Sequence, residues 1–251
     1  MDSRPNVRAE RSASLEEACD RFLDDLGAWI ARCLAELKDA PPTDGHDQGT
    51  FMLPWALHIG ARQNDEALEF MLRQRDRIRD HFVAKDKWRH GYWRMSEAHH
   101  GTEHFELFLG ALWRLRPTDA DTVAQFVDAA EHFGDWSDAV EPWFDWESGL
   151  YRSMYFGADG LRLEPGMDLN VPDHFRCVNI ALQAHEMTGA TRYLDLARCH
   201  AARWADAILG QEHLPVGLLA KGPVSDLSDQ SDATYRRFAG AVGSLDDHVG
   251  R

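Results

Sequence analysis

Residues 185–209 read HEMTGATRYLDLARCHAARWADAIL and contain one tight turn between two helical segments. Gly189 marks the turn, because glycine is the residue most often found just past the end of a helix. Apolar residues on both sides recur at steps of three and four, which predicts helices over about 173–187 and 190–210. This stretch is therefore predicted to be a helical hairpin.

The same arrangement occurs twice earlier in the chain. An Ala-Leu pair lies late in a predicted helix three times, at 56–57, 111–112 and 181–182. Eight residues after each Ala comes a turn or capping residue, which is Asn64, Asp119 or Gly189. The helical pattern also covers about 51–61, 64–82, 102–116 and 119–133. Because the spacings of 55 and 70 residues exceed those of tetratricopeptide and HEAT repeats, we predict three helix pairs joined by elaborated loops.

A longer helix precedes these pairs. Ser14 and Glu17 form a capping box, and apolar residues then recur at helical steps up to the segment 41–49, PPTDGHDQG, which is a loop by composition. Strand signals are scarce. The exception is 143–163, where aromatic residues between glycines predict a small β-hairpin or an ordered loop.

The hairpin at 185–209 resembles the inner-to-outer turn of the (α/α) toroids, the six-hairpin glycosidase-like superfamily. The resemblance rests on its TG turn, the Tyr-Leu that follows and the alanine-rich second helix, and it covers about 50–210. It implies an all-α fold, an (α/α) toroid or an incomplete arc of helical hairpins, over 14–223 after a polar tail at 1–13. A complete toroid needs more helices than this chain supplies. The polar segment 224–251 is therefore expected to be the start of a truncated continuation of the toroid. Alternatively, an additional chain or a homo-oligomer is expected to complete it.

Composition excludes several classes of protein. The chain has 42 acidic against 27 basic residues and a net charge of -15, which disfavours nucleic acid as a partner. No apolar run is long enough to span a membrane, and the N-terminus lacks the apolar stretch of a secretory signal. The four cysteines are far apart and are expected to be reduced thiols. We therefore expect a cytoplasmic protein.

The second and third helix pairs share a further pattern. Thr102-Glu103-His104-Phe105 and Pro172-Asp173-His174-Phe175 are equivalent at an offset of 70 residues. Glu103 and Asp173 are therefore expected to lie close together, as the acid/base pair that glycosidic hydrolysis needs. His104 and His174 are assigned to the same catalytic group.

The resemblance also predicts where substrate binds. The cleft of such toroids lies at the N-terminal ends of the inner helices, which here means the loops 85–104 and 143–176. Aromatic side chains there can stack on sugar rings, and polar ones can bind hydroxyl groups. The expected substrate-binding residues are His99, His100, Trp93, Trp143, Trp146, Tyr151, Asn170 and Arg176. The leading hypothesis is a carbohydrate-active enzyme, a glycoside hydrolase acting on an oligo- or polysaccharide.

Two other functions fit the same residues. A polysaccharide lyase would use a histidine or tyrosine as the base for β-elimination at a uronate, and a neutral imidazole suits that proton abstraction. Helical repeats can instead serve as non-catalytic interaction scaffolds. The enzyme hypotheses require Glu103, Asp173 and the histidines to converge, whereas a scaffold would spread its polar residues along one surface.

One metal pattern is present. His100, Glu103 and His104 match H-x-x-E-H, but Gly101-Thr102 reads as a helix start and strands are scarce, so a zinc peptidase is disfavoured. No metal or other cofactor is assigned. A site for a divalent ion among His99, His100, Glu103, His104 and Asp168 is kept as an alternative.

Arginines at 73, 75, 77 and 79 alternate with acids on a predicted outer helix. Alternating charges of this kind are typical of a solvated helix face.

Overall fold

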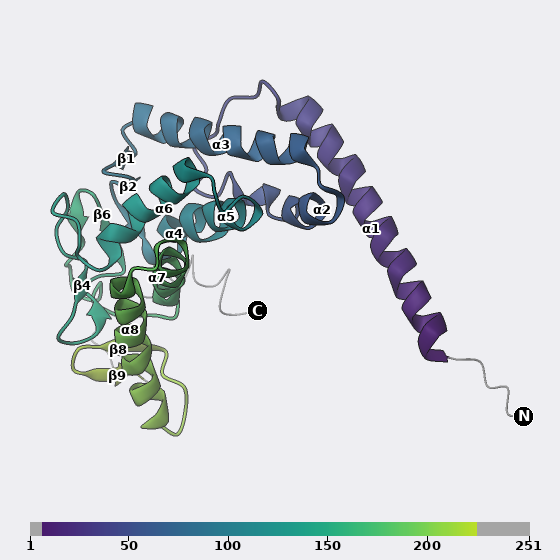
Figure 1. Ribbon diagram of the computed structural model, residues 1–251. Coiled ribbons are helices and arrows are strands. Elements are labelled where there is room, and N and C mark those ends of the chain that lie inside the picture. The colour runs from purple at the N-terminus through teal and green to yellow at the C-terminus, as the bar shows by residue number, and fades with distance from the viewer. Residues whose placement is uncertain (1–6, 225–251) are drawn as a thin grey trace, which may run out of the picture.

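The computed structural model describes residues 7–224 of the chain (Figure 1). Its helices are α1 (Val7–Leu37), α2 (Trp55–Arg62), α3 (Asp65–Ala84), α4 (Ala98–Glu103), α5 (Gly110–Leu115), α6 (Ala120–Phe133), α7 (His174–Thr188) and α8 (Thr191–Leu209). A short 3-10 turn, η1 (Thr50–Met52), precedes α2, and a π-helical segment, η2 (His104–Leu109), joins α4 to α5. The three predicted helix pairs are confirmed as α2 with α3, α4–η2–α5 with α6, and α7 with α8.

The predicted turn residues limit the helices as expected. The Asn64 side chain accepts a hydrogen bond from the Ala67 N–H at 3.0 Å and caps α3. Asp119 caps α6 through the Thr122 N–H at 2.8 Å. Gly189 ends α7 with a φ of 72°, a conformation that glycine adopts without steric cost.

The helix expected from residue 102 begins earlier, at Ala98. Glu97 caps it, because its carboxylate accepts a backbone N–H of the first turn at 2.7 Å. Gly101 lies inside the helix, where a Cβ atom would come within 2.6 Å of the Tyr92 hydroxyl. The glycine thus permits a close contact rather than breaking the helix, and Thr102 is not a cap.

The π-helical segment brings the inner helix against α7. The Glu106 carbonyl accepts a hydrogen bond from Gln183 Nε2 at 3.3 Å. A Cβ atom on Gly110 would lie 2.1 Å from Gln183 Oε1, so a larger residue there would displace the Gln183 amide. Segments of this kind occur mostly as short insertions in α-helices and often at functional sites.

The expected all-α class is wrong. Nine short strands form four small antiparallel sheets among the described residues: β1 (Trp88–Arg89), β2 (Tyr92–Trp93), β3 (Ser96–Glu97), β4 (Phe144–Asp145), β5 (Leu150–Tyr151), β6 (Tyr155–Gly157), β7 (Gly160–Leu161), β8 (Gly217–Leu219) and β9 (Gly222–Val224). Only β4 to β7 fall where a hairpin was predicted. The fold is therefore a mixed one, helical hairpins with small sheets, and the all-α toroid class does not describe it.

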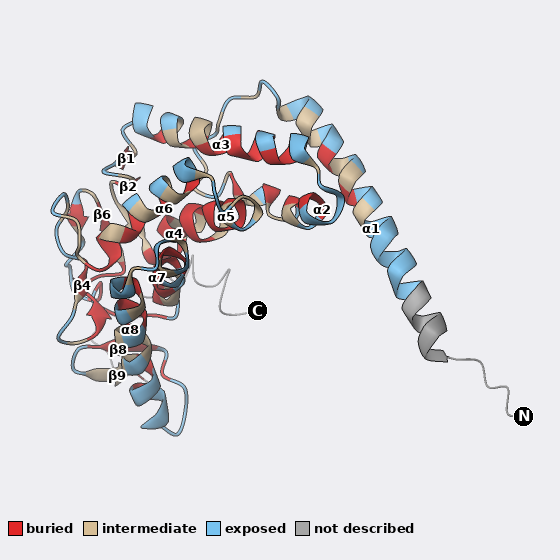
Figure 2. Cartoon of the chain, in the orientation of Figure 1, coloured by how far each residue is buried: buried red, intermediate tan, exposed pale blue. Residues whose placement is uncertain are grey.

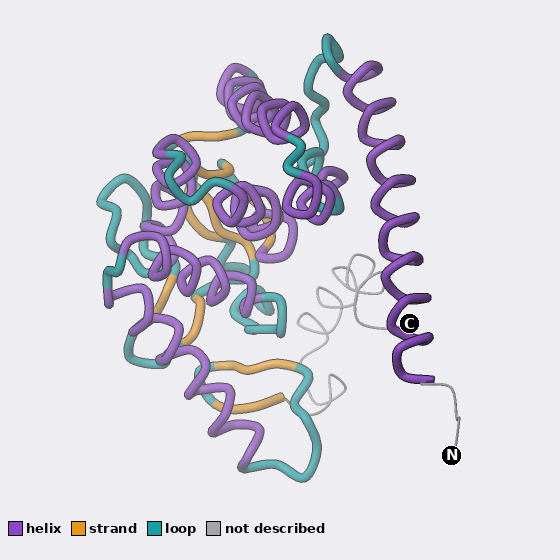
Figure 3. Tube along the Cα trace, turned by 45° about the vertical axis from the view of Figure 1, so that its right-hand side comes forward, coloured by secondary structure: helices purple, strands orange, loops and turns teal. Residues whose placement is uncertain are grey.

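The helices and sheets occupy different sides of the molecule. Helix α2 contacts α5, and the α4 and η2 parts of the same inner segment contact α7, while α3, α6 and α8 pack beside them. The strands gather on the side remote from α1 (Figure 3). Sheet β3–β6–β7 leads directly into α4, because Ser96 pairs with Phe156 and Glu97 with Tyr155. The start of α4 is therefore anchored by a strand that the sequence did not predict.

Helix α1 leaves the body of the molecule (Figure 1). Its C-terminal half packs on α2 and α3. The side chains described nearer its N-terminus are mostly exposed, including the apolar Leu15 and Phe22 (Figure 2). The helix begins at Val7, within the segment expected to be a polar tail, so Ser14 lies inside the helix and is not its cap. The segment expected at 224–251 lies outside the described residues apart from Val224.

Aromatic rings fill the space between the helices and the sheets. Trp88 and Tyr92 both stack on Phe105, at centroid distances of 5.3 and 5.2 Å. Trp143 stacks on Phe156 at 4.8 Å and is fully buried. Large buried rings contribute the most apolar area to a core, and offset or edge contacts add to it. This packing fixes the N-terminal half of the inner helix.

Arg75 departs from the expected solvated face. It is 3% exposed and lies between α3 and the start of α6. Its guanidinium pairs with Asp119 and donates to the Thr122 hydroxyl at 2.7 Å. Arg75 therefore joins the two outer helices at the α6 cap.

Candidate functional site

Two inner helices meet along a row of polar side chains. His99, Glu103 and Glu106 follow one face of α4 and η2, and residues at the N-cap and along the facing helix α7 pair with them. The facing residues are Asp173, Arg176, Asn179 and Gln183. We call this row the inner-helix polar row. It brings the two acids of the predicted pair into one network.

Glu103 and Asp173 contact the same imidazole ring. His99 Nε2 lies 3.1 Å from Glu103 Oε1, and His99 Nδ1 donates to Asp173 Oδ1 at 3.3 Å. The ring is therefore the spacer between the two carboxyl groups. Their separation falls below the roughly 10 Å that paired-carboxylate glycosidases require. The side chains of His99, Glu103 and Asp173 are 10%, 13% and 18% exposed, so the unit is shielded but open at one edge.

The contacts fix the charges of this unit. Asp173 and Glu103 together raise the pKa of His99 to about 9. Burial acts to raise the pKa of Glu103, but the neighbouring His46 and His99 outweigh it and hold that pKa well below its usual value. Burial acts to raise the pKa of Asp173 as well, but the contact with His99 outweighs burial and lowers that pKa. At neutral pH the unit is thus two carboxylates around one imidazolium.

Arg176 continues the row beyond this unit. Its Nε donates to the Thr102 hydroxyl at 2.9 Å and lies 3.1 Å from Glu106 Oε2. Asn179 Nδ2 donates to the other oxygen of Glu106 at 2.7 Å. Glu106 is therefore a buried carboxylate with partners on two turns of α7.

A loop between α1 and α2 borders the Glu103 side of the unit. His46 Nε2 lies 2.9 Å from Glu103 Oε2. The loop is braced by Gln48, whose side chain accepts the Thr43 N–H at 2.7 Å and donates to the Thr43 carbonyl at 2.8 Å. Gly49 packs on the Phe108 ring, where a Cβ atom would lie 2.7 Å from the ring carbon Cδ1. The close approach that glycine permits seats the loop on the inner helix.

A second histidine stands beside His46. His100 Nδ1 lies 2.5 Å from Glu97 Oε1, and the rings of His46 and His100 meet edge to face at 4.2 Å. Glu97 is the first cause of the raised pKa of His100. Each of the two histidines therefore has its own carboxylate, Glu103 for His46 and Glu97 for His100.

An open groove of about 480 Å³ runs past this histidine pair. It is lined by His46, Asp86, Lys87, Trp93, Arg94, Met95, Ser96, His100 and Asp159. The groove arginine Arg94 has two acidic partners. Its Nη1 lies 2.9 Å from Asp86 Oδ2, and its Nη2 lies 2.7 Å from Asp159 Oδ2. The volume falls in the range of small-molecule sites. The groove borders the network through His46, which contacts Glu103.

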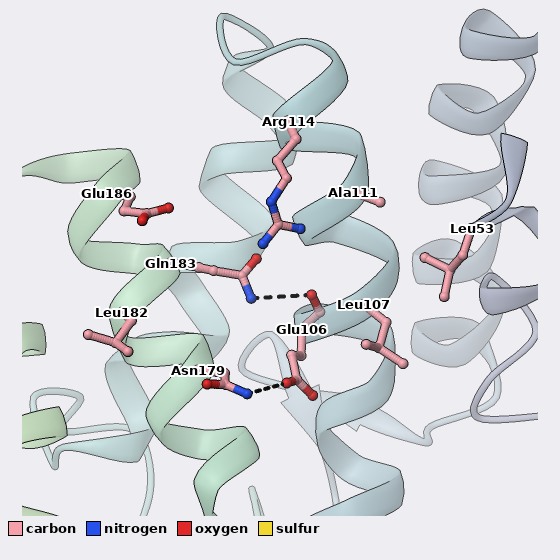
Figure 4. A pocket seen from close by; sticks show the side chains of 9 residues that line it. All are labelled: Leu53, Glu106, Leu107, Ala111, Arg114, Asn179, Leu182, Gln183 and Glu186. Atoms are coloured by element: carbon pink, nitrogen blue, oxygen red, sulfur yellow. Dashed lines mark hydrogen bonds between the residues drawn. The ribbon is translucent and has the colours of Figure 1, made fainter. Parts of the chain in front are cut away.

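A pocket of about 470 Å³ lies at the other end of the polar row (Figure 4). Figure 4 shows Asn179 and Gln183 of α7 reaching toward Glu106, with Arg114 of α5 above them. The lining also includes Leu53, Leu107, Ala111, Leu182 and Glu186. This pocket is thus lined by Glu106, Asn179 and Gln183 of the polar row.

The structure places His104 and His174 in the core. His104 is 1% exposed, packs among Trp88, Phe105 and Phe108, and burial lowers its pKa to about 3. His174 is fully buried, donates to the Ser153 carbonyl at 3.3 Å and stacks on Tyr151. In the two acid–His–Phe segments, the acids therefore meet at the site while the histidines face the packed interior.

Most of the expected sugar-binding aromatics are also interior. Trp143 and Tyr151 are buried, and Asn170 holds the Tyr151 backbone through hydrogen bonds of 2.8 and 2.7 Å to its N–H and carbonyl. Trp93 packs on Phe82 yet lines the groove. Trp146 is 43% exposed and donates to the Gly134 carbonyl at 3.3 Å, away from the groove residues. Trp93 is thus the one of these aromatics that the structure brings to the groove.

The H-x-x-E-H pattern does not form a metal pair of histidines. His100 faces the groove with His46, whereas His104 lies in the core. The residues do share one continuous helix, so the sequence argument about a helix start was wrong. His100 lies in α4, whereas His104 is the first residue of η2.

Sequence reasoning missed His46 and gave no role to Glu97, Glu106 and Asn179. The only local sign of His46 is its place between two aspartates in the loop PPTDGHDQG. Asn179 and Arg176 lie three residues apart on α7, which puts them on one face, but no pattern within α7 identifies Glu106 as their partner.

The chain matches no family model, no curated protein and no solved structure. Within residues 7–224, no helix combines the length and apolar character needed to cross a membrane. All four cysteines are free thiols, and Cys177 is buried. The case for a function therefore depends on the site itself.

Proposed function

We propose that this protein is a carbohydrate-active enzyme that hydrolyses glycosidic bonds at the Glu103–His99–Asp173 unit. The observation that supports it is the meeting of two carboxylates from different inner helices on one imidazole. Glycoside hydrolysis needs a proton donor for the leaving oxygen and a base or nucleophile across the scissile bond. The ring supplies both the spacing and a proton.

The proposed reaction divides the unit into two halves. The Nε2 side of His99, which Glu103 faces, donates a proton to the glycosidic oxygen as its bond to the anomeric carbon breaks. Asp173, on the Nδ1 side, takes a proton from the water that attacks the anomeric carbon. Asp173 then releases that proton to solvent and Nε2 takes one up from solvent, so one water is consumed and one new reducing end and one free hydroxyl form. Glu103 in this account holds and orients the imidazole, and is not itself the protonated acid.

The surroundings supply binding groups for a sugar. The groove beside the unit offers Trp93 as an apolar surface, with His46 and His100 at its edge. Arg176 lies 3.9 Å from Glu103 Oε1 and is itself held by Thr102 and Glu106. A scaffold protein does not require such convergence, because its polar side chains need only face a partner along one surface.

A lyase reaction is the second candidate. It is favoured by the imidazolium of His99 and the guanidinium of Arg176, which could together neutralise a uronate carboxylate while a groove histidine acts as base. The groove acids Asp86 and Asp159 oppose it, because they offset the charge of Arg94.

The experiment is incubation of the full chain with panels of neutral and uronate-containing oligosaccharides. New reducing ends without ultraviolet absorbance support hydrolysis, and absorbance from unsaturated products supports the lyase reaction. Cleavage of no glycan in either panel would contradict both. We also propose a cytoplasmic location, supported by the free thiols of the described cysteines.

A further inference from the structure

We propose that His46, Asp47 and Glu103 bind one zinc ion at the mouth of the groove. Each residue offers one ligand atom, and these atoms all lie within 4.8 Å of one another. An imidazole nitrogen with two carboxylate oxygens is a zinc-type donor set. Three protein ligands leave the fourth tetrahedral position open, as in catalytic zinc sites.

The geometry at Glu103 favours an ion over a simple ion pair. His46 Nε2 lies 2.9 Å from Glu103 Oε2, yet no donor among the described residues is aligned on that oxygen as a hydrogen bond. The oxygen is also shielded from solvent. A buried carboxylate oxygen without an aligned donor is costly, and a cation shared with His46 and Asp47 would satisfy it.

The other oxygen of Glu103 is already held. His99 Nε2 lies 3.1 Å from Oε1, and Asp173 in turn holds the other side of the His99 ring. Metal-ligating carboxylates are commonly oriented by outer partners of this kind, which fix the direction of the free oxygen. Asp173 and His99 would thus keep their contacts with an ion bound at Oε2.

The two loop ligands are presented by a braced segment. The double hydrogen bond between Thr43 and Gln48 closes the turn that carries His46 and Asp47. The Asp47 carbonyl accepts both the N–H and the hydroxyl of Thr50, at 2.7 and 2.8 Å. The imidazole favours zinc over magnesium or calcium, which prefer sites built from oxygen alone.

Calorimetric titration of Zn²⁺ into the chelator-treated full chain tests the site. We expect one ion per chain, with His46→Ala and Asp47→Asn each weakening binding about tenfold or more. His213→Ala, at an exposed histidine far along the chain, is the matched control and should leave the affinity unchanged. Zn²⁺ should also raise the unfolding temperature of the wild type more than that of His46→Ala, which shows in parallel that the variant folds.

Two results would overturn the proposal: absence of a stoichiometric site, or equal affinities of His46→Ala and His213→Ala. Magnesium binding more tightly than zinc at the same residues would overturn the choice of ion. The titration contains no glycan, so zinc binding can fail while glycan cleavage holds, and cleavage can fail while zinc binds.

Discussion

His99 Nε2 lies 3.1 Å from Glu103 Oε1, one turn further along the same helix. The pair is an (i, i+4) contact of the kind that stabilises helices, but here it extends to another helix because Asp173 holds the opposite nitrogen. A local contact thereby becomes a contact between α4 and α7.

Replacement of Gly110 by alanine should destabilise the junction between the inner helices. The new methyl group would collide with Gln183 Oε1, which lies 2.1 Å from the Cβ position. Overpacking of this kind costs about 1–3 kcal/mol in the free energy of unfolding, measured by urea denaturation. Gly60→Ala in α2 is the control, since no atom lies within 4 Å of its Cβ position, and it should be neutral or stabilising. Equal losses in both variants would contradict the packing described for Gly110.

His200 should make the protein lose stability in acid. It is fully buried, Nδ1 donates to the Gly149 carbonyl at 2.9 Å, and burial lowers its pKa to about 4. Because the folded pKa lies below the unfolded value of about 6.5, unfolding takes up a proton in that window. The contribution of neutral His200 to the free energy of unfolding is fully present above about pH 6.5. It decreases by up to about 3 kcal/mol as the pH falls to about 4.

Urea unfolding across that pH range, compared between wild type and His200→Leu, measures the effect. The absolute stability of the variant will be lower, because Trp204 Nε1 loses its acceptor. The relevant quantity is the slope with pH, which should be shallower in the variant. Parallel slopes would show that His200 is not the neutral buried group described above.

His104→Leu should leave catalysis intact. Both ring nitrogens of His104 are buried and have no hydrogen-bond partner among the described residues. Replacing an unpaired buried polar group with an apolar one of similar size changes stability by less than about 1.5 kcal/mol and can be favourable. His99→Gln, in contrast, removes the proposed proton donor and should lower the rate of glycan cleavage about a hundredfold or more. A similar loss of rate in a folded His104→Leu variant would return that residue to the catalytic group.

Arg75→Met should cost about 3 kcal/mol in the free energy of unfolding. The change leaves Asp119 and the Thr122 hydroxyl without the buried cation that joins α3 to α6. Arg73→Gln on the exposed face of the same helix is the control and should change stability by less than about 0.5 kcal/mol. Thermal or urea unfolding of both variants gives the comparison, and equal effects would contradict the buried role of Arg75.

Much of the helical framework could be predicted from the sequence. The caps at Asn64 and Asp119 and the turn at Gly189 depend on local chemistry, which a single segment records. The encounter of Glu103 with Asp173 was predicted from the offset of 70 residues between two equivalent segments. The two acids meet although Glu103 ends α4 and Asp173 precedes α7, because α4 packs against α7.

Other features depend on contacts that no local pattern contains. Gly101 looked like a helix break, but its lack of a side chain admits the Tyr92 hydroxyl. The two- and three-residue strands are too short to show alternation, so the all-α prediction failed there. His46 reaches the site because Gly49 packs on Phe108, an arrangement set by tertiary contact alone.

The central claim is that Asp173 works with Glu103 across the His99 ring in cleaving a glycan. The most direct test is the rate at which the wild type, Asp173→Asn and Asp168→Asn release reducing ends from the same oligosaccharides. Asp168 is an exposed acid of the preceding loop and serves as the matched control. We predict that Asp173→Asn lowers the rate about a hundredfold or more while Asp168→Asn retains it. Equal rates in the two folded variants would contradict the claim.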